Sequence, residues 1–360
     1  MRQDAAGQRP ERGQGRDAGM SVIGEPAAGM PTIDEVAAAA GVSKTTVSHV
    51  LSGNRPVAAA TRARVEQVIA ELGFQPSSVA RSLKASRSHT VALVVPDVTN
   101  PFYPALARGL QSSLEADGYL NLLADTHGDP GRERIFIADA VARRVDGIVL
   151  AGLALSSADL AATVRAGIPV VSVGGQLADA GIDVVTADDA RIAADAVRYL
   201  AGRGHQRIAT VAGAQGNPPG RARLDGFRRG LTEAGLRADA DLQIVSDWTR
   251  DGGFEGTAGL LALPYPPTAV FCANDLMAIG ALDAARAAGV DVPSGLAVIG
   301  VDDIDAAALV DPPLTTMKIP AFDIGHTTGS LLLERIRAPR RHIPRRSVLV
   351  GHQLITRRSA

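Results

Sequence analysis

The sequence predicts an all-α unit followed by an α/β core of two doubly wound parallel-sheet lobes. Residues 31–73 carry helical apolar spacing in three short segments, whereas from Thr90 short apolar runs alternate with amphipathic helical segments. Such alternation is typical of parallel sheets covered by helices on both faces. The roughly 270 residues after Thr90 are enough for two lobes of ordinary domain size.

Composition limits the class of protein. The 360 residues are 46% hydrophobic and 21% charged, with a net charge of −1, which suits a folded chain and excludes a uniformly basic nucleic-acid coat. The single cysteine, Cys272, excludes intramolecular disulfides. No apolar run approaches the roughly 20 residues of a membrane span, and the N-terminus lacks the apolar segment of a secretory signal. We therefore expect a cytoplasmic protein without a membrane partner.

Residues 1–30 are rich in Gly, Arg, Ala and Gln and show no periodicity, which predicts a disordered leader. Met30 directly precedes the first helical segment, so we hypothesise that the native chain begins at Met30 rather than Met1. N-terminal sequencing of the native protein tests this, and a chain that begins at Met1 contradicts it.

Two helices follow the leader. The segment Thr32-Ile33-Asp34-Glu35 has the spacing of a capping box and begins a helix over 36–40, which Gly41 ends. Ser43 is placed to cap a second helix over 44–51. This spacing of two short helices about a glycine is that of a helix-turn-helix.

A third helix and a linker complete the N-terminal unit. Thr61 is expected to cap the third helix and Gly73 to end it. Its apolar positions at i, i+3, i+4 and i+7 are Val65, Val68, Ile69 and Leu72. Within the linker over 77–89, residues 77–84 suit a short helix that is too short to be stable alone in water.

The second helix carries the side chains expected to contact DNA. Its polar residues face outward, and a helix of this kind fits the major groove with its first residues at the base edges. These residues are Ser43, Lys44, Thr45, Thr46, Ser48 and His49. Residues 31–88 hold seven basic and four acidic side chains, a net charge of +3. The alternative is an ordinary three-helix surface unit whose charges are only solvated.

The chain resembles the LacI–GalR family of transcription regulators over about residues 31–357. Each matching motif is short, but their order along the chain is specific. The motifs are Thr32-Ile33-Asp34-Glu35-Val36-Ala37, Gly41-Val42-Ser43, Thr45-Thr46-Val47-Ser48-His49-Val50-Leu51, Pro76-Ser77-Ser78-Val79-Ala80-Arg81-Ser82-Leu83, Asn100-Pro101-Phe102, Arg203-Gly204-His205, Ala273-Asn274-Asp275, Gly300-Val301-Asp302-Asp303 and Pro313-Leu314-Thr315-Thr316.

The resemblance implies a homodimer that binds a near-palindromic operator. Residues 31–76 would form the DNA-binding domain and residues 77–89 the hinge helix and linker. Thr32, Ser77 and Ala80 join the second helix as implied DNA contacts, and Leu83 would wedge into the minor groove and kink the duplex. The alternative for Leu83 is a packing residue of the linker. His49 stands where many members carry arginine, so the recognised base is open.

The resemblance also implies a periplasmic-binding-protein-like core over 90–360, with three crossovers between two lobes. The first lobe would hold 90–187 and 318–346, and the second 188–317 and 347–357. A small-molecule effector, a sugar or related metabolite, would bind between them. The implied effector-binding residues are Asn100, Phe102, Arg223, Trp248, Asn274 and Asp302. Gly174 and Ile319 replace polar residues of many sugar-responsive relatives, which indicates a less polar ligand or another pose.

Other functions remain open at this point. No catalytic, metal-binding or phosphate-loop motif is present, so we expect neither an enzyme nor a cofactor. A solute-binding transport component would need an export signal and no DNA-binding unit. A DNA-binding protein whose cleft has lost its ligand is a further alternative, in which Trp248 is an ordinary core residue. Because no heptad segment follows the core, we expect a dimer rather than a tetramer.

Overall fold

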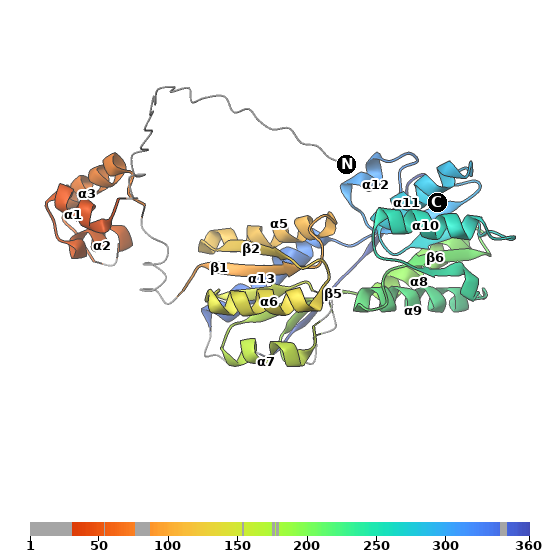
Figure 1. The fold of residues 1–360 in the computed structure, drawn as a ribbon, viewed down its shortest axis with the longest axis horizontal. Coiled ribbons are helices and arrows are strands. Elements are labelled where there is room, and N and C mark those ends of the chain that lie inside the picture. The colour runs from red at the N-terminus through yellow and green to blue at the C-terminus, as the bar shows by residue number, and fades with distance from the viewer. Residues whose placement is uncertain are drawn as a thin grey trace, which may run out of the picture. The chain divides into compact units, whose positions relative to one another are not determined.

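The computed structural model describes residues 31–53, 55–75, 87–152, 155–174, 177, 180–338 and 344–360. These residues form an N-terminal helical unit and a larger α/β unit, each considered by itself (Figure 1). The predicted leader over 1–30 and the predicted hinge helix over 77–84 lie outside the described residues, and so do Ser77, Ala80 and Leu83.

The helical unit consists of α1 (Ile33–Ala40), α2 (Lys44–Ser52) and α3 (Ala59–Leu72). Its small core centres on Val36, Val47 and Val65, each fully buried. Removing these side chains from water is the main force that holds three such short helices together.

Two of the three predicted N-terminal helix caps are confirmed, although α1 begins at Ile33 rather than at the predicted Val36. Thr32 and Glu35 form a capping box, and the Ser43 hydroxyl accepts a hydrogen bond from the Thr46 amide at 3.1 Å. The predicted cap at Thr61 is wrong. Helix α3 begins at Ala59, and the residue in the N-cap position, Ala58, has no side chain that could form a capping hydrogen bond. The alanines before Thr61 have the highest helix propensity of any residue and extend the helix in the N-terminal direction.

The first lobe of the α/β unit is a six-stranded sheet in the order β11-β5-β4-β3-β1-β2, with every neighbouring pair parallel. Its strands are β1 (Thr90–Val95), β2 (Leu120–Asp125), β3 (Gly147–Leu150), β4 (Val170–Val173), β5 (Asp183–Ala187) and β11 (Ser347–Val350). Its helices are α5 (Phe102–Leu114), α6 (Pro130–Ala142), α7 (Ser157–Arg165) and α13 (Ala321–Arg337). Helices α5 and α13 pack on one face, and α6 and α7 on the other.

The second lobe has the sheet order β12-β10-β9-β8-β6-β7, in which only the edge strand β12 is antiparallel. Its strands are β6 (Ile208–Ala212), β7 (Gln243–Val245), β8 (Ala269–Cys272), β9 (Ala297–Asp302), β10 (Thr315–Lys318) and β12 (Gln353–Ile355). Its helices are α8 (Asp189–Gly202), α9 (Pro218–Glu233), α10 (Arg250–Leu261), α11 (Asp275–Ala287) and α12 (Asp305–Leu309).

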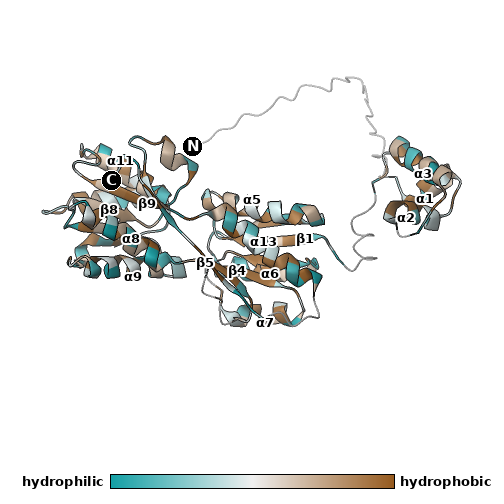
Figure 2. Cartoon of the chain, turned by 180° about the vertical axis from the view of Figure 1, so that it is seen from behind, coloured by the Kyte–Doolittle hydropathy of each residue, from teal (hydrophilic) through white to brown (hydrophobic). Residues whose placement is uncertain are grey.

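The central strands of both sheets are buried on two faces. Alternate residues of β8 contact different layers: Phe271 stacks on Phe227 of α9, with ring centroids 6.3 Å apart, while Cys272 packs in the layer beneath α11. Figure 2 shows the resulting apolar strands inside each lobe and the mixed colouring of the helices around them. Among the described residues, no helix is long and apolar enough to cross a membrane.

The chain passes between the lobes three times, as predicted: from β5 to α8, from β10 to α13, and from β11 to β12. The assignment of all of 347–357 to the second lobe is wrong, because β11 pairs in parallel with β5 of the first lobe. The cause lies at Asp183, the first residue of β5. Its buried carboxylate accepts the backbone amide of Arg346 at 2.7 Å and so fixes the start of β11 beside β5.

Candidate functional site

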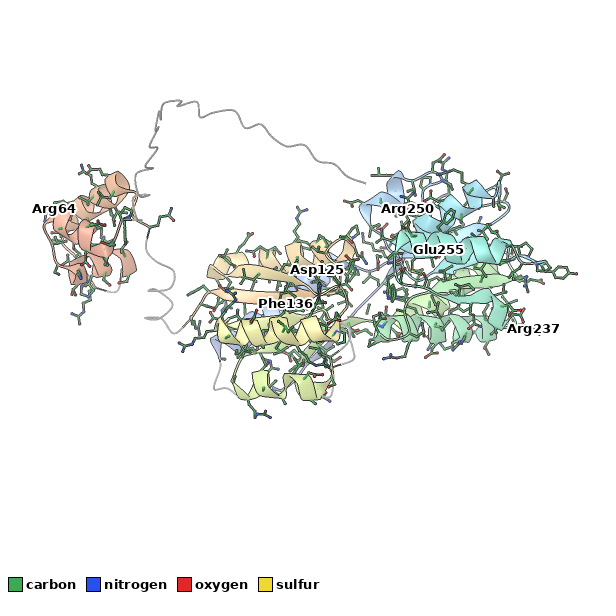
Figure 3. The ribbon with its side chains drawn as sticks, in the orientation of Figure 1. Arg64, Asp125, Phe136, Arg237, Arg250 and Glu255 are labelled. Atoms are coloured by element: carbon green, nitrogen blue, oxygen red, sulfur yellow. The ribbon has the colours of Figure 1, made fainter. Side chains whose placement is uncertain are left out.

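Helix α2 presents the predicted DNA-contacting side chains on one exposed surface. Val47 and Val50 are buried against α1 and α3, which orients the remaining face of α2 toward solvent. Ser43, Lys44 and Thr45 are exposed, while Thr46, Ser48 and His49 are partly exposed. Arg64 of α3 adds an exposed guanidinium to the unit (Figure 3).

Thr32 stabilises the start of α1. Its hydroxyl and its backbone amide both donate to the Glu35 carboxylate, at 3.0 and 2.6 Å, to close the capping box. These contacts order the start of α1. A contact between Thr32 and DNA therefore stays a prediction.

A cleft of about 560 Å³ lies in the α/β unit at the carboxyl ends of the strands of both sheets. Open α/β sheets bind their ligands in this location. All six predicted effector-binding residues line this cleft: Asn100, Phe102, Arg223, Trp248, Asn274 and Asp302. Tyr103, His127, Asp189, Asn217 and Asp247 also line it and were missed by the sequence analysis.

Arg223 is the most firmly held polar group of the cleft. It projects from α9, is only 7% exposed, and its Nε donates to Asp189 of α8 at 2.8 Å. A second guanidinium nitrogen donates to the carbonyl oxygen of Ala273. The guanidinium carbon lies 5.6 Å from the centroid of the Trp248 ring, within cation–π range. Arg223 is thereby held on three sides, by Asp189, by the Ala273 carbonyl and by the Trp248 ring.

Asp302, the last residue of β9, has a backbone φ of +114°, a conformation that residues other than glycine rarely adopt. Burial raises the pKa of this carboxyl to about 7; the Arg223 guanidinium opposes the rise and Asp189 adds to it. Tyr103 contributes a phenol to the same region, and burial followed by the Asp302 charge raises its pKa. These groups form one coupled cluster around Arg223.

This cluster predicts a pH dependence of stability. Between about pH 4 and pH 7 the folded chain retains a proton on Asp302 that the unfolded chain releases, so the free energy of unfolding falls as the pH rises through this window. The Asp302→Asn variant has no such group, and asparagine tolerates a positive φ. The melting temperature of Asp302→Asn minus that of the wild type should therefore increase from pH 4 to pH 7 and then level off. A difference that does not change with pH would contradict this prediction.

The side chains of Asn274 and Asn100 form hydrogen bonds with backbone groups. Asn274 accepts the amide of Met277 at 2.9 Å and donates to the carbonyl of Trp248 at 3.0 Å, so it caps α11 and holds the loop that carries the tryptophan. Trp248 itself has a φ of +73°, which this hydrogen bond helps to maintain. Asn100 accepts the amide of Phe102 at 3.1 Å at the start of α5.

Asp275, directly after Asn274, serves the fold. Its buried carboxyl accepts the Ile304 amide at 2.9 Å and the Thr316 hydroxyl at 2.6 Å. Burial, followed by the charge of Asp302, raises its pKa well above the usual value. It joins the start of α12 to β10, behind the wall of the cleft.

The position of the Trp248 ring depends on Gly213. A Cβ atom at position 213 would overlap the edge of the indole ring. We expect Gly213→Ala to displace the ring and to shift the fluorescence of the only tryptophan in the chain. Gly216→Ala, nearby and without atoms close to a new Cβ, is the matched control. An unchanged emission spectrum in Gly213→Ala would show that the ring is held elsewhere.

Both lobes supply polar groups to the cleft. The second lobe supplies Arg223 and the carboxyl groups of Asp189, Asp247 and Asp302. The first lobe supplies Phe102, Gly174, with a φ of +101°, and Ile319, together with the polar side chains of Asp97, Thr99, Asn100, Tyr103, His127 and Thr186. The two residues that depart from sugar-responsive relatives therefore lie on the wall of the cleft.

Comparison with known proteins agrees with this architecture. Residues 32–77 match the family model of bacterial regulatory proteins of the lacI family, and residues 197–360 match a periplasmic binding protein-like domain. The ribose operon repressor of Escherichia coli K12 is 37% identical over 312 residues, which cover 86% of this chain and 94% of that protein. The transcriptional repressor CytR of the same organism is 36% identical, covering 91% and 96%.

A solved structure shares the fold across nearly the whole chain. The lac repressor dimer bound to operator and the anti-inducer ONPF superposes with a TM-score of 0.81 and 27% identity, covering 91% of this chain and 98% of that one. A helical DNA-binding unit joined to a two-lobed α/β core with a ligand cleft defines a class of ligand-responsive transcription regulators. The chain belongs to the lacI family of bacterial regulatory proteins.

Proposed function

We propose that this protein represses transcription from a near-palindromic operator and that a small-molecule effector in the cleft controls its affinity for that DNA. The observation that supports this best is the convergence of the six predicted cleft residues, from both lobes, on one cavity. Its relatives named as repressors support the direction of control. Binding to chromosomal DNA places its action in the cytoplasm.

The charges of the cleft favour an uncharged effector. Among the described residues, four carboxyl groups line it, those of Asp97, Asp189, Asp247 and Asp302, whereas the one guanidinium is already paired with Asp189. A phosphate or carboxylate on the ligand would meet the negative charges of Asp97 and Asp247. Phe102 and Trp248 offer flat surfaces for the apolar face of a ring, and carboxylates accept hydrogen bonds from hydroxyl groups. We therefore propose a sugar or related polyhydroxylated metabolite, in line with the relative named for ribose.

The first lobe also offers a surface for a second copy of the chain. Edge strand β2 leaves Leu120 66% exposed, Leu122 50% and Leu123 40%. A long edge strand with exposed apolar side chains is prone to pair with another chain. We propose that the homodimer covers this edge, as the named lac repressor neighbour is a dimer.

The proposed control is a linkage between cleft and DNA. Two lobes joined by three crossovers can close around a ligand, and closure changes the angle between lobes that each copy of the dimer presents to its partner. The spacing of the two DNA-binding units then changes. By thermodynamic reciprocity, operator DNA must alter effector affinity by the factor by which effector alters operator affinity.

Calorimetry with and without operator tests this linkage. We expect the effector to bind the free protein and its complex with operator with dissociation constants that differ by about fivefold or more. Equal constants would contradict control by the effector.

The replacement of polar groups by Gly174 and Ile319 favours one second candidate, a constitutive DNA-binding protein. In that case no sugar would change the fluorescence of Trp248.

A further inference from the structure

Lys44 is a basic residue at the N-terminus of α2 in the DNA-binding unit. It is the first residue of α2, where side chains reach the base edges when a recognition helix enters the major groove. A cation at a helix N-terminus is unfavourable, because the helix dipole places partial positive charge there. The first turn of α2 holds no acidic residue that would offset it.

The compensating charge comes from the neighbouring helix. The Lys44 ammonium forms an ion pair with the carboxylate of Asp34 in the first turn of α1. The adjacent acid, Glu35, is occupied by the capping box with Thr32. Asp34 is therefore the acid of this turn that reaches α2.

The pair is weak enough for DNA to displace. Its side chains are 66% and 55% exposed, and ion pairs this exposed contribute little to stability. In solution Asp34 nevertheless offsets part of the Lys44 charge and places a carboxylate beside it on the exposed surface of the DNA-binding unit. Affinity for DNA of any sequence depends on the number of lysine and arginine side chains that neutralise phosphates.

We propose that Asp34 is a specificity-determining residue: it competes with phosphate for Lys44 and so lowers the affinity for non-operator DNA. The inference rests on the proposed DNA-binding function. On an operator, hydrogen bonds from Lys44 to base acceptors offset the loss of its partner, whereas non-operator DNA offers only solvated phosphates. Asp34 thus widens the gap between the two affinities.

The competing explanation gives Asp34 a role in α1 alone, as an acid favourable to the helix N-terminus. The two explanations differ in whether the effect of Asp34 requires Lys44. A double-mutant cycle on the full chain separates them. The variants are Asp34→Asn, Lys44→Gln and the double substitution, with Glu71→Gln of α3 as a control that removes the same charge without touching Lys44.

Each variant is titrated against a labelled duplex of arbitrary sequence at several salt concentrations, with circular dichroism as the check on folding. Asp34→Asn should tighten binding about twofold to fivefold at low salt. It should also steepen the salt dependence by about 0.9, the share of one phosphate contact. Lys44→Gln alone should change both quantities little, and in its background Asp34→Asn should lose most of its effect.

Four results overturn the proposal. The first is unchanged affinity in Asp34→Asn. The second is an equal effect of Asp34→Asn with and without Lys44, and the third is an equal effect of Glu71→Gln. The fourth, independent of any change at Asp34, is a salt dependence that Lys44→Gln lowers by about 0.9, because Lys44 would then already contact phosphate. A wild-type chain that binds no duplex overturns the proposed function together with this inference.

Discussion

Replacing Arg223 by glutamine is expected to weaken effector binding about a hundredfold or more, equivalent to about 3 kcal/mol, while leaving DNA binding intact without effector. The guanidinium is buried, donates to Asp189 and to the Ala273 carbonyl, and stacks on Trp248. Its loss leaves Asp189 without its partner in a buried wall and frees the indole ring. The cleft then lacks both its cation and its ordered aromatic surface.

The measurement is a fluorescence titration of Trp248 with any sugar that produces a response in the wild type. Arg229→Gln is the matched control, since Arg229 lies on the same helix, is half exposed and pairs with Glu233. A second readout is the pKa of Asp302, which Arg223 lowers and which should therefore rise further in Arg223→Gln. Wild-type affinity in Arg223→Gln would place the effector elsewhere.

The second large effect is expected at Asp183, where substitution by alanine should cost about 3–5 kcal/mol of the free energy of unfolding of the core. The carboxylate is fully buried and accepts two hydrogen bonds from Arg335, at 2.8 and 2.6 Å, and one from the Arg346 amide at 2.7 Å. Its removal leaves the Arg335 guanidinium in a partly buried position without this carboxylate and releases β11 from β5.

Urea denaturation of the full chain measures this loss, with Asp117→Ala as the control. Asp117 pairs with the exposed Arg337 on the surface of the same lobe, so its loss should cost far less than the loss of Asp183. Burial raises the pKa of Asp183, but the hydrogen bonds from Arg335 and Arg346 outweigh it and hold the pKa below its usual range. The contribution of Asp183 should therefore disappear as the pH falls below about 4. If Asp183→Ala lowers the free energy of unfolding no more than the control does, Asp183 does not hold β11 beside β5.

Strands buried on both faces could be predicted from sequence because they are short, continuous and apolar. The runs Val91–Val95, Ala269–Cys272 and Ala297–Val301 satisfy this description, and each lies within a strand of the structure. Strands at the sheet edges could not, because pairing on one side leaves them partly exposed and mixed in composition. Strand β2 contains Asn121, and β12 consists of three residues. The lobe to which β11 belongs depends on the contact of Arg346 with Asp183, 163 positions away in sequence.

The same distinction applies to the cleft. Asn100, Asn274 and Asp302 follow predicted strands, so the rule that ligands bind at strand carboxyl ends singles them out. Asp189 begins a helix, and its importance comes from Arg223, 34 positions further along the chain. Tyr103 directly follows Phe102, yet only the orientation of α5 shows that both rings line the cavity. Pairings of this kind arise from the packing of α8, α9 and α5 and leave no local signal.

The most direct test of the account is selection of bound duplexes from a random DNA pool by the purified chain at fixed salt. Two copies of α2 in successive major grooves predict a recovered near-palindrome. A wedge at Leu83 predicts a flexible pyrimidine–purine step at its centre. The selection is repeated with candidate sugars, so that a requirement for an effector is not mistaken for lack of binding. Failure to enrich any sequence under both conditions would contradict the assignment as an operator-binding regulator.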